Sequence, residues 1–191
     1  EQGIAAYGFS SHAPLPFDCK WPVQPSKVGD YCRHVDFLKE KYSGRIQIYK
    51  SLEIDYIPGM MGPNHPEIKK LDLDYTIGSI HFIDKFQDGR PWEADGNHWK
   101  FATGLLEIFQ GDIKRAVKRY FQLTREMIHR DCPDILGHLD KVKIQNHFFD
   151  YFSEDEAWYK EEIEKTLSVI AQSEVIVEVN TRGLYKKKTN S

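Results

Sequence analysis

The sequence predicts an α/β protein whose strands run parallel and are joined by crossover helices. Segments with a strand pattern alternate with segments with a helix pattern, and the links between them are short. This rhythm is typical of repeated strand–helix–strand units, because the chain must return along a helix before the next parallel strand begins. The length of 191 residues fits one domain. We therefore expect a single α/β domain over residues 1–191.

The first half of the chain contains three predicted strands. The apolar run at residues 4–9 predicts the first of them. Residues 28–42 carry apolar side chains at helical spacing and predict an amphipathic helix. Residues 45–55 predict the second strand and residues 75–81 the third, with a short helix at 66–71 between them.

The stretch at residues 84–103 interrupts this alternation. It is polar and aromatic, and it contains Trp92, His98 and Trp99 among glycines. Long loops on α/β scaffolds often cover an active site, so we expect a loop here that either covers the site or simply packs against the domain.

The second half resumes the alternation. Residues 112–129 predict a helix whose first residue, Asp112, can cap it. Residues 134–139 predict the fourth strand. The sequence SEDE at 153–156 is a capping box that should open a helix to about residue 172. The β-branched run at 175–179 predicts the fifth strand.

The predicted elements do not complete a barrel. Five strands cannot close one, and (β/α) barrels typically need about 250 residues. The chain also opens at what resembles the end of a helix and stops shortly after a strand. We expect it to be the middle of a larger domain, with amino-terminal and carboxy-terminal strands missing.

Composition narrows the possible partners. Hydrophobic residues make up 40% and charged residues 29% of the chain, as in an ordinary soluble domain. A net charge of -3 does not favour nucleic acid, and no apolar run approaches the roughly 20 residues that span a membrane. The three cysteines form no C-x-x-C pair, which favours a reducing, cytoplasmic compartment. We expect neither nucleic acid nor membrane as a partner, and the sequence leaves the oligomeric state open.

Four side chains of the metal-ligand type stand near the ends of predicted strands. They are His12, Glu53, His81 and His138. Active sites of parallel α/β folds lie at the carboxyl ends of the strands, so these side chains should converge. Imidazole and carboxylate are ligands for zinc, manganese or iron, and a carboxylate can bridge two ions. Each histidine could instead be a hydrogen-bonded structural residue, but the shared register of all four favours a metal site.

Arg182 follows the last predicted strand in the sequence NTRG. Its planar guanidinium suits a phosphate group, which makes it a candidate for phosphate binding. A solvent-facing arginine explains the position equally well on the sequence alone. Lys141 and Lys143 are weaker candidates for anion binding.

Five segments resemble, in the right order, motifs of the PHP (polymerase and histidinol phosphatase) superfamily. They are GFSSHAP at residues 8–14, LEIDYIPG at 52–59, GSIHF at 78–82, GHLD at 137–140 and VEVNTRG at 177–183. Together they are similar to the histidinol-phosphatase branch, and the resemblance runs from about residue 4 to 184. The opening H-x-H and the closing D-x-H motifs of the family are absent from these 191 residues.

The resemblance implies a distorted, TIM-like (β/α)7 barrel that holds two or three divalent ions, usually zinc, manganese or iron. It implies metal ligation by His12, Glu53, His81 and His138, with Glu53 as the bridging carboxylate, and contact between Arg182 and the phosphate. We expect Glu53 and His81 to be the catalytic residues. A cation cluster makes hydroxide available near neutral pH, and hydroxide can then attack phosphorus.

The implied activity is hydrolysis of a phosphomonoester, histidinol phosphate, to histidinol and phosphate in histidine biosynthesis. Two alternatives remain open at this point. The same centre could act on another phosphomonoester or on phosphotyrosine, as other branches of the superfamily do. The domain could also be a PHP module that binds without catalysis.

Overall fold

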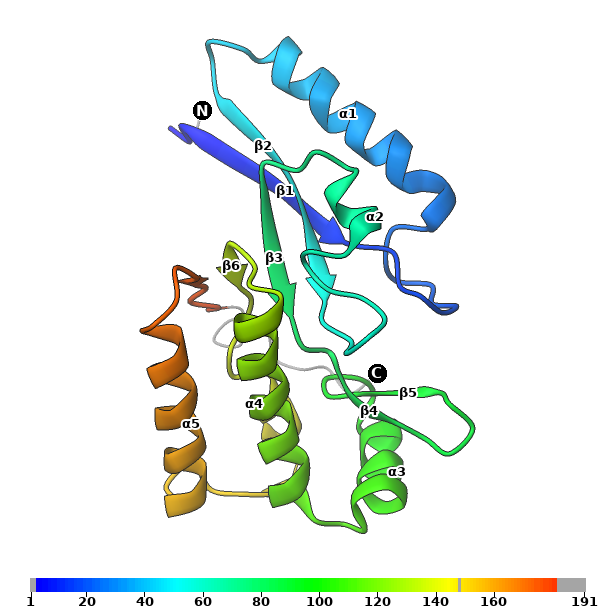
Figure 1. Ribbon diagram of the computed structural model, residues 1–191, viewed down its shortest axis with the longest axis vertical. Helices are drawn as coiled ribbons and strands as arrows, with labels where there is room; N and C mark the ends of the chain where they lie inside the picture. The colour runs from blue at the N-terminus through cyan, green and yellow to red at the C-terminus, as the bar shows by residue number, and fades with distance from the viewer. Residues whose placement is uncertain (1–2, 148, 182–191) are drawn as a thin grey trace.

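A parallel sheet forms the centre of the protein (Figure 1). The computed structural model describes residues 3–147 and 149–181. The sheet has five strands in the order β1-β2-β3-β6-β7, and every neighbouring pair is parallel. The strands are β1 (Ala6–His12), β2 (Gln47–Asp55), β3 (Tyr75–Ser79), β6 (Ile135–Leu136) and β7 (Ile176–Val177). The parallel α/β arrangement predicted from the alternation is therefore confirmed.

Helices connect the strands and cover the sheet (Figure 1). They are η1 (Pro25–Lys27), α1 (Val28–Lys41), α2 (Pro66–Lys69), α3 (His98–Phe109), α4 (Ile113–Arg130), η2 (Lys141–His147) and α5 (Ala157–Ile170). Helix α1 lies along β2, whereas α4 and α5 pack side by side next to β6. Helix α4 begins where expected, because the Asp112 carboxylate accepts a hydrogen bond of 3.0 Å from the Arg115 amide.

Two hydrophobic clusters stabilise the fold. The larger cluster joins α3, α4 and α5 to the segments after β3 and includes the buried side chains of Trp92, Tyr120 and Phe121. The smaller cluster packs α1 and α2 against β2 through Leu52 and Ile54. Burial of such apolar surface is the main favourable term in folding. The ligand-type residues on the strands are thus anchored from two sides.

The approach of β3 to helix α4 requires a glycine. A Cβ atom on Gly78 would lie 2.7 Å from Cγ of Pro133 and 2.8 Å from Sδ of Met127. Both distances are shorter than carbon and sulfur atoms tolerate in a packed interior. The glycine therefore lets the strand that leads to His81 sit directly beneath the helix.

The stretch at residues 84–103 differs from the predicted loop. It forms an antiparallel hairpin of β4 (Phe82–Lys85) and β5 (Pro91–Glu93), and it then enters helix α3. Asn97 caps this helix by accepting a hydrogen bond of 2.9 Å from the Trp99 amide. The prediction of a single loop was wrong because the strands are short, and burial of Trp92 against α3 holds them together.

The capping box at residues 153–156 also has a different place from the one expected. The Ser153 amide donates a hydrogen bond of 3.0 Å to the Glu156 carboxylate. These residues nevertheless form a turn before the helix, and α5 begins at Ala157. The pattern therefore predicted a helix at the right place in the chain, but it put the start of the helix a few residues too early.

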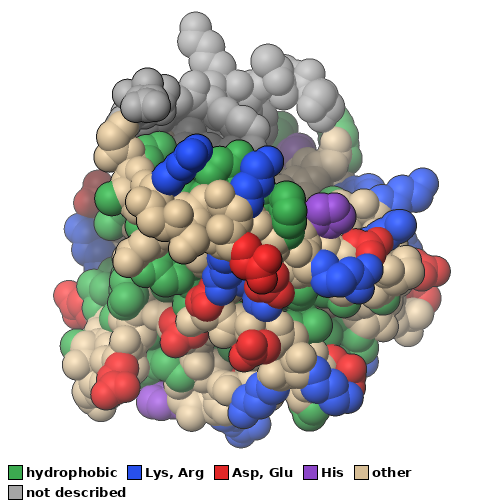
Figure 2. Space-filling model, turned by 90° about the horizontal axis from the view of Figure 1, so that it is seen from above, with side chains coloured by type: hydrophobic (Ala, Val, Ile, Leu, Met, Phe, Trp, Pro, Cys, Tyr) green, Lys and Arg blue, Asp and Glu red, His purple; other side chains and the backbone are tan. Residues whose placement is uncertain are grey.

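Charged side chains of both signs are interspersed on the surface. Figure 2 shows lysines and arginines alternating with aspartates and glutamates over one face. Among the helices of residues 3–147 and 149–181, none combines the length and the apolar character needed to cross a membrane.

Candidate metal centre

The strand register brings four of the predicted residues to one edge of the sheet. His12 is the last residue of β1 and pairs in register with Glu53 of β2. His81 and His138 follow the ends of β3 and β6, which are the next strands in the sheet. The carboxyl ends of adjacent parallel strands therefore present one carboxylate and three imidazoles to a common point.

Glu53 lies at the centre of this group. Its Oε1 is 2.9 Å from Nε2 of His138 and 3.5 Å from Nε2 of His81. Its other oxygen, Oε2, is 3.7 Å from Nε2 of His12. One carboxylate thus faces three imidazoles with both of its oxygens, which is the arrangement that a bridging carboxylate requires.

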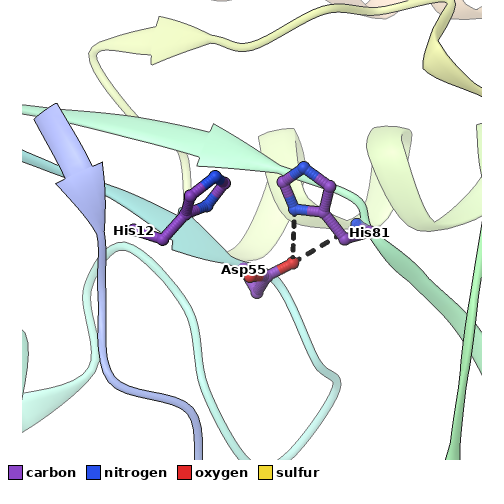
Figure 3. Close-up of side chains that lie close together, drawn as sticks. All are labelled: His12, Asp55 and His81. Carbon is purple, nitrogen blue, oxygen red and sulfur yellow. Dashed lines mark hydrogen bonds and ion pairs between the residues drawn. The ribbon is translucent and has the colours of Figure 1, made fainter. Parts of the chain in front are cut away.

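Asp55 is a further candidate site residue, which the sequence patterns did not single out. Its carboxylate is 2.8 Å from Nδ1 of His81 and accepts a hydrogen bond of 3.3 Å from the His81 amide. Figure 3 shows this contact, with His12 on the neighbouring strand. A carboxylate that accepts a hydrogen bond from one ring nitrogen of a histidine fixes the orientation of the ring. This arrangement is common at histidines that bind a metal through the other nitrogen. The signal was present, since residues two apart on a strand share a face and Glu53 is already there.

The backbone around His138 supports the same centre. The His138 amide donates a hydrogen bond of 2.7 Å to the Glu178 carboxylate. A Cβ atom on Gly137 would lie 2.5 Å from Oγ of Ser79, and that hydroxyl donates a hydrogen bond of 2.8 Å to Glu53. Gly137 thus permits the close approach of this segment to Ser79, whose hydroxyl holds Glu53.

The charges of the centre shift the pKa values of its members. Burial would raise the pKa of Glu53, but the hydrogen bond from His138 and the charges of His12 and His81 lower it to about 2. Burial opposes the charged form of His81, yet the adjacent Asp55 raises its pKa to about 9. Burial lowers the pKa of His12. The group therefore carries negative charge that favours a cation at its centre.

The donor atoms fit a metal ion. Two overlapping groups, His12–Asp55–His81 and Glu53–His81–His138, each keep their ligand atoms within 4.8 Å of one another. Nδ1 of His12 and Nδ1 of His138 are buried and have no hydrogen-bond partner within the described part of the chain. Imidazole with carboxylate is a donor set for zinc, manganese or iron.

The predicted residues have different outcomes in the structure. His12, Glu53, His81 and His138 are brought together, although their function as ligands stays a prediction. Arg182 lies outside the described residues, so its predicted contact with phosphate stays a prediction as well. Lys141 pairs with Asp95, and Lys143 pairs with Asp140 and Glu154.

These features define a parallel α/β protein with a histidine–carboxylate centre at the carboxyl ends of its strands. A sequence model of the PHP domain matches residues 1–182. The chain therefore belongs to the PHP domain family.

Curated relatives carry histidinol-phosphatase names. A protein of Deinococcus radiodurans named "Probable histidinol-phosphatase" is 24% identical over 149 residues, which cover 77% of this chain and 53% of that protein. The histidinol-phosphatase of Bacillus subtilis is 25% identical over 203 residues, covering 97% of this chain and 72% of the relative. The chain thus spans about half the length of the Deinococcus radiodurans relative and 72% of the length of the Bacillus subtilis relative.

Solved structures share the fold. A Listeria monocytogenes protein with a provisional histidinol-phosphatase name superposes with a TM-score of 0.76 at 20% identity, over 98% of this chain and 75% of that one. The histidinol phosphate phosphatase of Lactococcus lactis was solved in complex with zinc, L-histidinol and phosphate. It superposes with a TM-score of 0.61 at 20% identity, over 94% of this chain and 63% of that one. These similarities confirm the predicted fold class.

The Asp55–His81 contact predicts a measurable loss of metal affinity. Replacing Asp55 with Asn keeps the shape but removes the charge that makes the His81 ring a stronger donor. We expect Mn²⁺ or Zn²⁺ to bind about 10- to 100-fold more weakly, as measured by calorimetric titration. Asp36→Asn is the control, because Asp36 pairs with Lys50 on the other face of β2. Equal affinities for Asp55→Asn and the unmodified protein would contradict an orienting role.

The raised pKa of His81 predicts that metal binding depends on pH. With a pKa of about 9 the ring is protonated at neutral pH, and an incoming cation must displace that proton. The apparent affinity should therefore rise about tenfold per pH unit up to pH 9 for one displaced proton. Mn²⁺ titrations in buffers of different ionisation enthalpy measure the release, and His34→Gln on α1 is the control. Binding that is independent of pH would show that the raised pKa of His81 is wrong.

Proposed function

We propose that this chain supplies most of the metal centre of a phosphomonoesterase that hydrolyses histidinol phosphate to histidinol and phosphate. The observation that carries the proposal is the arrangement of three imidazoles around the Glu53 carboxylate at the carboxyl edge of the sheet. Membership of the PHP family and the names of the relatives support the same reaction. We infer a place in histidine biosynthesis and in the cytoplasm, without nucleic acid or membrane as a partner.

We assign the ligand positions to His12, Glu53, His81 and His138, for two or three divalent ions of zinc, manganese or iron. One Glu53 oxygen faces His12, and the other faces His81 and His138. Bound divalent ions would supply Lewis-acid stabilisation of the phosphoryl oxygens and acidify a water molecule.

The residues of the chain would position and polarise the reacting groups. Glu53 remains ionised at all working pH values because its pKa is about 2. Asp55 holds the His81 ring so that Nε2 faces Glu53, and the Ser79 hydroxyl holds Glu53 in turn. Glu53 and His81 are therefore the residues to which we assign catalytic function. Arg182 is assigned to the substrate phosphate from its residue type and its place after the last strand.

The test is a combined measurement of metal content and substrate preference. The full-length protein that carries this sequence is purified, and its metal content is measured by elemental analysis. Phosphate release is then followed with histidinol phosphate, phosphotyrosine and 4-nitrophenyl phosphate. We expect at least two metal ions per chain and a saturable preference for histidinol phosphate.

Other outcomes would assign a different function. Metal with a preference for phosphotyrosine or for aryl phosphate would identify a phosphatase of another substrate class. A protein that binds no metal and releases no phosphate from any of the three substrates would be a non-catalytic binding module. Either result would overturn the proposal.

A further inference from the structure

The hairpin after β3 presents acidic side chains beside the metal centre. The Ala94 amide donates a hydrogen bond of 2.7 Å to the carbonyl oxygen of His81, so residues 93–96 lie directly against a proposed ligand. This segment contains two carboxylates, Glu93 and Asp95, and neither belongs to the donor groups of the centre. The hairpin therefore brings to the site two carboxylates that metal ligation does not use, of which Asp95 is paired with Lys141.

Residues of η2 hold this segment in place. Nε2 of Gln145 donates hydrogen bonds of 3.1 Å to the Ala94 carbonyl and 3.0 Å to the Gly96 carbonyl. The Lys141 ammonium lies 3.2 Å from Oδ2 of Asp95. Gln145 is only 2% exposed, and its Oε1 has no hydrogen-bond partner among residues 3–147 and 149–181. A buried acceptor without a partner thus lies beside this loop, where it could take a hydrogen bond from a donor on a ligand.

An aromatic side chain completes this side of the centre. The Trp21 ring is 4.5 Å from the His12 ring and 5.9 Å from the His81 ring, measured between centroids. It remains 43% exposed. Its ring stacks with that of Phe82, at 6.4 Å between centroids, and Phe82 pairs with Glu93 in the hairpin. Burial, followed by the charge of Asp95, raises the pKa of Glu93, while the charges of Lys100 and His81 act in the opposite direction.

We propose that Trp21, Glu93 and Asp95, called here the acidic rim, bind the alcohol part of the substrate and select alcohols that carry a positive charge. The inference rests on the proposed function, since it names the leaving group that this phosphatase accepts. A carboxylate beside an indole face attracts an ammonium or imidazolium group by charge and by a cation–π contact. A neutral alcohol gains neither contact.

The acidic rim gives a specific kinetic prediction. Glu93→Gln and Asp95→Asn keep the shape of the rim and remove its charge. In the full-length protein each should lower kcat/KM for histidinol phosphate by about 10- to 100-fold, mainly through KM, because a charge-assisted hydrogen bond is lost. The value for 4-nitrophenyl phosphate, whose alcohol is uncharged, should change by less than about threefold, and metal content should stay constant. Asp88→Asn at the exposed turn of the same hairpin is the control.

A binding measurement separates this inference from the proposed function. Calorimetry with L-histidinol reports on the rim without turnover, and we expect the Kd to rise about tenfold in Glu93→Gln and in Asp95→Asn. If the unmodified protein is inactive but binds L-histidinol, and the two variants bind it more weakly, the proposed function is overturned and the inference about the acidic rim stands. If the protein is active but the variants lose kcat/KM equally for both substrates, or lose metal, the inference about the acidic rim is overturned and the proposed function stands. Unchanged kinetics and unchanged binding in both variants would also overturn it.

Discussion

Replacing Glu53 with Gln is expected to remove most of the proposed phosphatase activity together with a large part of the metal that we propose the centre binds. The Glu53 carboxylate faces His12, His81 and His138 with its two oxygens. Glutamine has nearly the same size, but it is neutral and one of its oxygens becomes an amide nitrogen, which cannot bind a cation. We expect kcat/KM to fall at least about 100-fold and the metal content to drop, as measured by phosphate release and elemental analysis.

A matched control makes this result specific to the centre. Glu107→Gln is the same chemical change at an exposed position on helix α3, and it should leave activity and metal content unchanged. The circular dichroism spectrum of Glu53→Gln should match that of the unmodified protein. If Glu53→Gln retained full activity with its metal, the carboxylate would not be a bridging ligand.

Replacing Trp92 with Ala should cause the largest loss of stability among single changes away from the centre. Trp92 is 1% exposed, and its Nε1 donates a hydrogen bond of 3.2 Å to the Phe101 carbonyl. Its ring packs against Phe101 and Phe109, with centroids 5.1 Å and 5.4 Å away. Truncation of such a side chain typically costs about 3–5 kcal/mol, a large share of the roughly 5–15 kcal/mol that stabilises most domains. Urea unfolding measures the change.

Trp99 provides the comparison for this measurement. It lies on α3, the helix against which Trp92 packs, and is 75% exposed, so Trp99→Ala should change the free energy of unfolding by no more than about 0.5 kcal/mol. Equal effects of the two substitutions would mean that the hairpin does not pack on α3 as described. Because β5 leads into the acidic rim, Trp92→Ala should also disturb the position of Glu93.

The strand-end histidines could be found from the sequence because parallel strands all end at the same edge. That rule needs only approximate strand boundaries. Residues 4–9 were predicted for a strand that extends to His12, and His12 was still placed correctly at the end of it. Asp55 was not predicted, although its spacing from Glu53 already placed both side chains on one face of β2.

The hairpin and α3 could not be predicted in the same way. Strands β4 and β5 contain only 4 and 3 residues, too few to show a clear periodicity. Their pairing depends on burial of Trp92 against a helix that follows later in the chain. The acidic rim therefore belongs to a part of the fold that tertiary packing determines, and local sequence patterns do not reveal it.

The separation of the two hydrophobic clusters has a consequence for local unfolding. His12 and Glu53 stand on strands anchored by the smaller cluster, whereas His81 and His138 follow segments anchored by the larger one. A cation bound to all four would link two packing units that could otherwise open separately. Amide hydrogens of β1 and α1 should then exchange more slowly as metal is added, although they lie on elements outside the larger cluster.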